Sequence, residues 1–96
     1  MKAIMMVCDQ ELQPEMDFLL RSNHIETFTL IQKVQGSGES GLKLGNPIGP
    51  GLNLVYWIVL DPVTAKKFVE ELKLFKEQKL KKKGVQVFVI PIEEGF

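Results

Sequence analysis

The chain has 96 residues, the size of one small domain. Twelve acidic residues balance twelve basic ones, so no overall field attracts the protein to nucleic acid or to anionic membranes. A single cysteine excludes an internal disulfide framework and favours a reducing compartment. The apolar run Ala3–Cys8 is too short for a signal peptide or a membrane span. We therefore expect a soluble cytoplasmic protein with no nucleic-acid partner and no membrane insertion.

The start of the chain predicts a strand followed by a helix. Lys2–Cys8 is a short apolar run, typical of a strand buried on both faces. Asp9 can cap the helix that follows, and Pro14 is tolerated because it falls in the first turn, where its missing N–H has no intrahelical partner. The helix would bury one stripe of side chains at helical spacing: Leu12, Met16, Leu19 and Leu20.

The turn-formers Ser22-Asn23-His24 end this helix. Ile25–Gln35 is rich in β-branched and aromatic residues and predicts a second strand. Gly36–Asn53 then holds six of the eight glycines and two of the five prolines. A connection of this length between two strands is unusual in a compact domain and is usually functional or disordered.

Leu54–Leu60 is the most apolar segment and has no polar alternation. Such a strand is normally covered on both faces. Helices can cover one face, but a chain of this size has little left to cover the other. We therefore expect an oligomer.

The last third of the chain predicts a helix and a strand. Asp61-Pro62 is a helix start, with an N-cap followed by proline at the first helical position. Lysines fill the carboxyl end of this helix, and Gly84 suits the residue beyond its last turn. Val85–Ile90 is a final strand, and Pro91 ends its pairing or marks a sheet edge.

The element order is βαββαβ. Two right-handed crossovers with antiparallel neighbours predict an α+β fold of the ferredoxin-like class, with a four-stranded antiparallel sheet and two helices on one face. Residues 1–96 would form a single domain that presents the glycine-rich loop 36–53.

The segment Gly36–Gly41 matches the pattern G-x-G-x-x-G and follows a strand. A dinucleotide-binding fingerprint also needs a helix to open there, and Leu42–Pro50 supplies glycine and proline instead. We therefore reject a Rossmann site and assign Asp61 to helix capping. Two interpretations remain open for the glycines: their backbone N–H groups converge on an anion, or they only turn the chain.

The lysine run Lys79–Lys83 also has two interpretations, a phosphate grip or a solvated helix end favoured by the helix dipole. No nucleophile–base pair can be proposed, because nothing links the single histidine, His24, to Cys8 or to a serine. We therefore expect no enzyme, no catalytic residues and no fixed cofactor.

Three segments resemble the PII-like signalling proteins, the superfamily of nitrogen-regulatory PII. They are the opening strand Met1–Cys8, the stretch from Phe28-Thr29 to Val34–Gly38, and the close Val87–Glu94. The last is similar to the FVLPVEE ending of PII, and Gly36-x-Gly38 is similar to the start of its T-loop. The resemblance spans nearly the whole chain. It implies a homotrimer, effector binding in clefts between subunits, and regulation of a partner protein through the loop.

The sequence also departs from PII. Lys83-Gly84-Val85-Gln86 stands where PII has the phosphate-gripping Gly-Asp-Gly-Lys, and the loop is several residues shorter and lacks the modified tyrosine. No pair of arginines follows Glu93-Glu94 before the sequence stops at Phe96. These differences favour a divergent, short-loop branch that senses another small molecule or ion over the ATP and 2-oxoglutarate sensing of PII.

The leading hypothesis is a non-enzymatic regulator that binds a nucleotide or another small anion. Its ligand-binding residues would be Gly36, Gly38, Lys43, Lys83 and Gly84, and its target a transporter or an enzyme. An alternative is a trimeric metal-tolerance protein like the CutA proteins, which share this fold, with candidate ligands Met5, Met6, Cys8 and His24. An acylphosphatase-type enzyme is disfavoured, because Arg21, the only arginine, lies in a predicted helix and not in a phosphate-cradling loop.

Overall fold

The computed structural model describes residues 1–35, 52–79 and 84–96. Four strands and two α-helices follow one another in the order βαββαβ, with a 3-10 turn before the first helix. The elements are β1 (Lys2–Asp9), η1 (Gln10–Leu12), α1 (Gln13–Ser22), β2 (Thr29–Val34), β3 (Asn53–Leu60), α3 (Pro62–Lys79) and β4 (Val85–Pro91).

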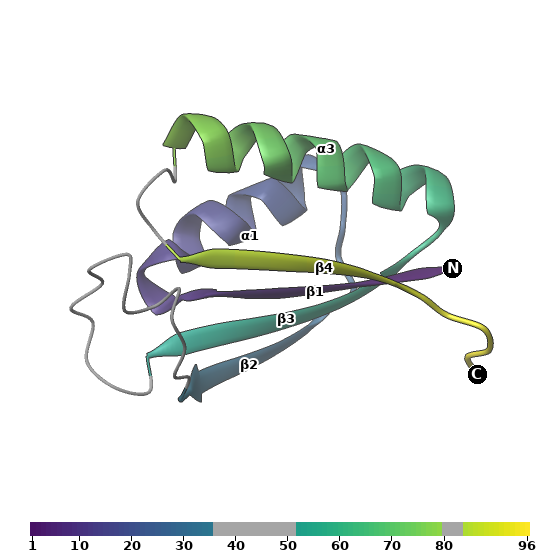
Figure 1. The fold of residues 1–96 in the computed structure, drawn as a ribbon, viewed down its shortest axis with the longest axis horizontal. Coiled ribbons are helices and arrows are strands. Elements are labelled where there is room, and N and C mark those ends of the chain that lie inside the picture. Colours follow the sequence, from purple (N-terminus) through teal and green to yellow (C-terminus); the bar gives the residue numbers. More distant parts are fainter. Residues whose placement is uncertain (36–51, 80–83) are drawn as a thin grey trace.

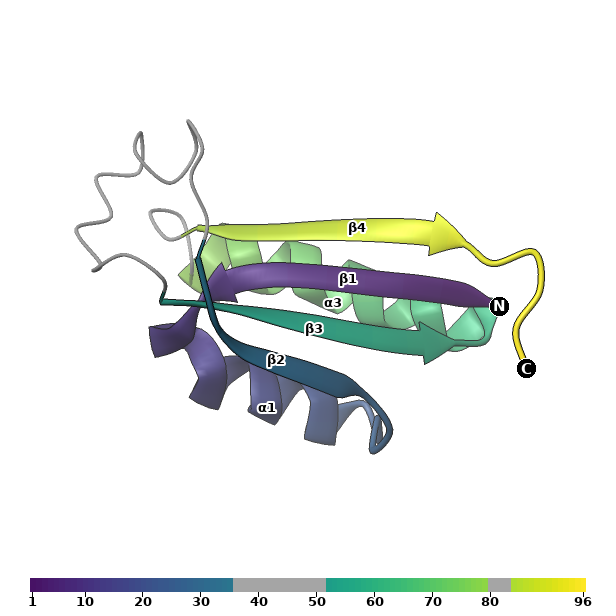
Figure 2. The same cartoon turned by 90° about the horizontal axis from the view of Figure 1, so that it is seen from below.

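The four strands form one antiparallel sheet in the order β2-β3-β1-β4. Helices α1 and α3 both lie on one face of this sheet (Figure 1). Viewed from the other side, the strands lie in front and no helix covers them (Figure 2). The ferredoxin-like α+β fold predicted from the order of the elements is therefore confirmed.

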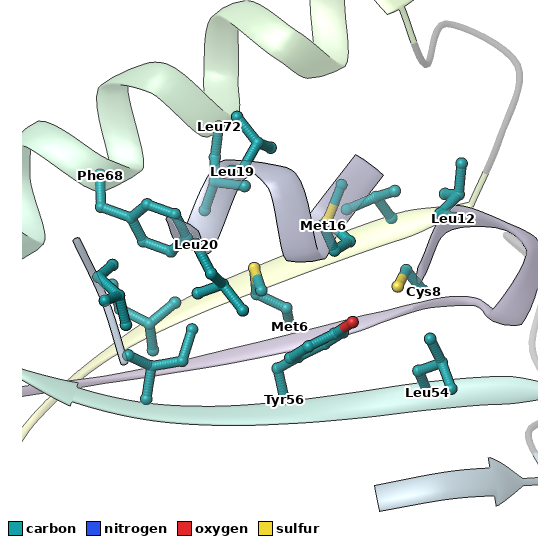
Figure 3. Packing of buried hydrophobic residues seen from close by; sticks show 14 of the residues in the cluster. Met6, Cys8, Leu12, Met16, Leu19, Leu20, Leu54, Tyr56, Phe68 and Leu72 are labelled. Carbon is teal, nitrogen blue, oxygen red and sulfur yellow. The ribbon is translucent and has the colours of Figure 1, made fainter. Parts of the chain in front are cut away.

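The core lies between the sheet and the two helices. Alternate residues of β1 and β3 point towards the helices, because successive side chains of a strand point to opposite faces. Met6, Cys8, Leu54 and Tyr56 from the strands pack with side chains of both helices (Figure 3). The predicted stripe of the first helix is buried in this core: Leu12, Met16, Leu19 and Leu20.

The start of the first helical segment differs in detail from the prediction. Asp9 acts as a cap, but of the 3-10 turn η1: its Oδ1 accepts a 2.8 Å hydrogen bond from the N–H of Glu11. Helix α1 begins after this turn, at Gln13, and Pro14 lies in its first turn as predicted. The proline therefore removes no intrahelical hydrogen bond.

The end of α1 is a Schellman motif. The N–H of Ile25 donates to the carbonyl of Leu20 at 2.9 Å, and the N–H of His24 donates to that of Arg21 at 3.0 Å. His24 has a φ of 57°, the left-handed conformation that such a motif requires and that usually favours glycine. The apolar Ile25 then packs into the core with Leu20.

The second strand is shorter than the predicted Ile25–Gln35. Strand β2 comprises only Thr29–Val34, and its pairing with β3 starts at Thr29 opposite Trp57. The difference follows from the helix end, because Ile25 is held in the core by the motif that ends α1. Residues 26–28 are needed to carry the chain from there to the sheet edge.

Helix α3 begins as the sequence predicts. Both carboxylate oxygens of Asp61 accept hydrogen bonds from Thr64, Oδ1 from its N–H at 2.9 Å and Oδ2 from its Oγ1 at 2.7 Å. Asp61 is therefore a helix cap, which is the role assigned to it when the dinucleotide fingerprint was rejected. The described part of the helix ends at Lys79, so the fit of Gly84 to its last turn lies outside the described residues.

Candidate effector site at the loop-bearing end of the sheet

Four strand ends meet at one end of the sheet. Strands β1 and β2 end there at Asp9 and Val34, and strands β3 and β4 begin there at Asn53 and Val85. The carboxyl end of α3 lies at the same end (Figure 1). The residues that flank both glycine- and lysine-rich connections, 36–51 and 80–83, therefore share one end of the molecule.

Most of the predicted ligand-binding residues lie outside the described residues: Gly36, Gly38, Lys43 and Lys83. Gly84 is described, and it is half-buried directly before β4. It lies on the opposite edge of the sheet from Val34, because β2 and β4 are the two edge strands. Within one chain, two other strands thus separate the root of loop 36–53 from Gly84.

Strand β2 contains a β-bulge next to the loop root. Ile31 pairs with Val55 and Val34 pairs with Asn53, so β2 has one more residue than β3 between the two pairs. Within the bulge Lys33 has a φ of 57°. Bulges bend a strand and change the direction in which it continues. Sequence reasoning missed this feature, since a lysine gives no signal for a left-handed conformation.

A backbone hydrogen bond holds the returning end of the loop. The N–H of Gln10 donates to the carbonyl of Leu52 at 3.0 Å. Beside it, Asp9 is almost completely buried, with 2% of its surface exposed. The bond between Asp9 and the N–H of Glu11 fixes the turn that follows β1. The return of the chain from the loop is therefore anchored to the end of the central strand β1.

A lysine of α3 contacts the first residue of β4. Lys76 Nζ donates a 2.8 Å hydrogen bond to the carbonyl oxygen of Val85. This bond holds an ammonium group beside the residue that follows Gly84. From the sequence, Lys76 was only one of several lysines near the helix end, and nothing in the spacing singled it out.

The candidate ligands of the metal-binding alternative are not gathered together. Met6 and Cys8 are buried under the helices, while Met5 points to the other face of β1. His24 is exposed beyond the carboxyl end of α1. In the described part of the chain no group of three or more His, Cys, Asp or Glu side chains could hold a metal ion.

The chemistry of Cys8 also disfavours metal binding and nucleophilic attack. Burial, together with the negative charges of Asp9 and Asp17, raises the pKa of its thiol to about 12. Metals and electrophiles react with the thiolate, which this environment suppresses. Arg21, the residue of the acylphosphatase alternative, is exposed in the last turn of α1, as its helical assignment predicted.

Comparison with known proteins gives matches among solved structures. No protein-family model and no curated protein sequence matches the chain. CPII from Thiomonas intermedia K12, a nitrogen regulatory PII-like protein solved with ADP, AMP and bicarbonate, superposes with a TM-score of 0.73 at 16% identity. The match covers 99% of this chain and 92% of CPII. The chain has the PII-like fold.

Two further structures agree with this fold. The apo form of CPII superposes with a TM-score of 0.62 at 13% identity, covering 95% of this chain and 89% of that one. A PII-like signalling protein from Thermus thermophilus, TTHA0516, gives 0.64 at 16% identity, covering 92% and 82%. The PII-like resemblance stated from three sequence segments is therefore confirmed at the level of the fold. None of the helices described for this PII-like chain has the length and apolar character needed to cross a membrane.

Proposed function

We propose that this protein is a cytoplasmic, non-enzymatic PII-like regulator. A homotrimer would bind a small anionic effector in the clefts between its subunits. Loop 36–53 would change conformation with the effector and thereby bind or release a target protein, a transporter or an enzyme. The observation that carries the proposal is the PII-like fold over nearly the full chain, shared with CPII, which was solved with ADP, AMP and bicarbonate.

An apolar sheet surface supports the oligomer. We use the name open face for the side of the sheet away from the helices, formed by Met5, Ile31, Trp57, Val59, Phe88 and Ile90. Met5 lies between Trp57 and Phe88 in one row across three strands. Trp57 is 39% exposed, Phe88 45% and Val59 51%. A continuous apolar surface of this kind marks an interaction site.

The edge strand β4 supports the same conclusion. Its sequence VQVFVIP has no charged residue, and it pairs with β1 without a register shift. Val89, on the helix side, and Ile90, on the open face, are both partly exposed at 45% and 37%. A long, flat, apolar edge is an aggregation hazard unless another chain covers it. A neighbouring subunit would cover both this edge and the open face.

The subunit cleft gives a reason for the placement of the predicted ligand-binding residues. Gly36, Gly38 and Lys43 belong to the loop that leaves β2, whereas Lys83 and Gly84 precede β4 on the other edge of the sheet. In a ring of three subunits that pack head to tail, opposite edges of neighbouring copies face each other. The loop root of one subunit would then meet Gly84 of the next.

The effector would act through its differential affinity for two loop conformations. A ligand shifts a conformational equilibrium only if it binds one state more tightly than the other. Ordering of a loop by ligand contacts is an established form of such a switch. The same change would expose or remove the surface that the target protein recognises.

Two measurements test the proposal. Light scattering should give a particle of three times the 10.9 kDa chain mass, and Phe88→Lys on the open face should dissociate it. The matched control, Lys66→Glu on the exposed side of α3, should leave the trimer intact. A wild-type protein that remains monomeric would contradict the cleft model.

Ligand binding is tested by calorimetry and thermal shift with ADP, AMP and bicarbonate. Lys83→Ala and Gly38→Val should weaken binding and reduce the protection against heat, while Lys66→Ala should not. Absence of binding by the wild-type protein would remove the anionic effector from the proposal. Undiminished protection in the two site variants would show that the site lies elsewhere.

A further inference from the structure

Lys76 is held in one place although its side chain is long. An exposed lysine normally samples many rotamers, and fixing it costs side-chain entropy. Here the 2.8 Å bond from Nζ to the carbonyl of Val85 joins α3 to the start of β4, across nine positions of the sequence. The position of the ammonium group is therefore set before any ligand arrives.

The positive charge of Lys76 is not neutralised by this bond. Its partner is a neutral carbonyl oxygen, and it is the only polar partner of Lys76 among residues 1–35, 52–79 and 84–96. A lysine ammonium carries three N–H donors, and the carbonyl uses one of them. The other two, together with the full charge, remain for a further acceptor. Lys76 is also exposed, so such an acceptor can reach it.

The acidic group nearest to this point along the sheet is engaged elsewhere. Val85 pairs with Cys8, so Asp9 lies one residue beyond that pair on the neighbouring strand. Asp9 is buried, and its Oδ1 accepts the N–H of Glu11. The ammonium of Lys76 and the backbone of Gly84 lie together at the start of the edge strand β4.

We propose that Lys76 is a ligand-binding residue that contacts a phosphate or other anionic group of the effector beside Gly84. This inference rests on the proposed function and adds a residue that it does not include. It gives the site a fixed cation from helix α3 where Lys83-Gly84-Val85-Gln86 differs from the phosphate-gripping turn of PII. A cation that is already in position binds an anion with a smaller loss of entropy.

The test compares three variants of the full-length protein by isothermal calorimetry with ADP and with adenosine, which lacks the phosphates. Lys76→Gln should weaken ADP binding by about tenfold or more, because a hydrogen bond to a charged group is lost. Lys76→Arg keeps the charge and should stay within about threefold of the wild type. Lys67→Gln is the matched control: it removes the same charge about 14 Å away along α3, and ADP affinity should change by less than about twofold.

Adenosine and thermal melting separate binding from a structural role. Lys76→Gln should leave the affinity for adenosine unchanged and lower the melting temperature only slightly. If wild-type protein binds ADP and Lys76→Gln binds it as tightly as Lys67→Gln does, Lys76 is only a tether between α3 and β4, and the inference is overturned. If wild-type protein binds neither ADP, AMP nor bicarbonate, the anionic effector and the role of Lys76 fall together.

Discussion

The phenol of Tyr56 in strand β3 donates a 2.9 Å hydrogen bond to Oδ1 of Asp17 in helix α1. Tyr56 is completely buried, and its ring also contacts that of Phe28, with centroids 5.8 Å apart. Burial and the bond to Asp17 together raise the pKa of Tyr56. The pair fixes the first helix on the sheet through a polar contact within an otherwise apolar core.

Removal of this hydroxyl should destabilise the protein. In Tyr56→Phe the ring stays in place and Asp17 loses its donor, so we expect the free energy of unfolding to fall by about 2 kcal/mol. Urea denaturation measures the change. A double-mutant cycle with Asp17→Ala provides the control, because the losses of two interacting residues do not add. Additive losses would contradict the interaction.

Cys8 should make the stability depend on pH in the alkaline range. Its pKa rises from 9.0 to about 12 on folding, mainly by burial. The folded protein therefore holds this proton more tightly than the unfolded chain. The resulting stabilisation is complete below pH 9 and is lost as the pH rises from 9 towards 12.

Urea titrations at about pH 8, 9 and 10 measure this loss. Between about pH 9 and pH 10 the free energy of unfolding should decrease by about 1 kcal/mol. Cys8→Ala serves as the control: it is less stable overall because of the cavity, but its stability should be flatter over the same interval. Equal slopes for the two proteins would mean that the thiol ionises as easily in the fold as outside it.

The cap of α3 is a second source of pH dependence, at acid pH. Hydrogen bonds from the backbone N–H and then the side chain of Thr64 lower the pKa of Asp61 on folding. Its contribution is therefore present above its unfolded pKa and is lost as the pH falls through its lower folded pKa.

Asp61→Ala should lower the melting temperature at neutral pH, because the N–H of Thr64 loses its acceptor. Asp61→Asn retains a capping oxygen and should melt close to the wild type. Circular dichroism in the far ultraviolet follows both transitions. A greater loss for asparagine than for alanine would show that the negative charge, and not the cap, matters.

The left-handed residue at the end of α1 offers a stabilising substitution. His24 has a φ of 57°, a conformation that costs a non-glycine residue about 1–2 kcal/mol. His24→Gly should therefore raise the free energy of unfolding by about 1 kcal/mol, after allowance for the entropy of glycine in the unfolded chain. His24→Ala keeps the backbone cost and should give no such gain. A gain in both variants would point to the imidazole and not to the backbone.

The predictions that succeeded rest on residues close together in the sequence. Asp61-Pro62 specifies a helix start by itself, since the cap and its donors lie within three positions. Pro14 marks the first turn of α1 for the same reason. The boundary of β2 was wrong at its amino end, because the Schellman motif at His24 places Ile25 in the core and delays strand pairing until Thr29.

The contacts that matter most for the candidate site join distant residues. The bulge at Lys33 depends on the register between β2 and β3, and the bond from Lys76 to Val85 depends on how α3 lies against β4. The partner of Tyr56 is 39 positions away in the sequence. Local composition carries no signal for any of these three.

The sequence by itself determined the order of the elements, the starts of the helices and the excess of apolar residues in Leu54–Leu60, because periodicity and capping act within a few residues. Only the tertiary structure decided which face of that strand the helices cover. Pairing with β1 turns Leu54, Tyr56 and Ile58 to the core and leaves Trp57 and Val59 on the open face. A period of two cannot tell the covered face from the open one until the neighbouring strand and helix are in place.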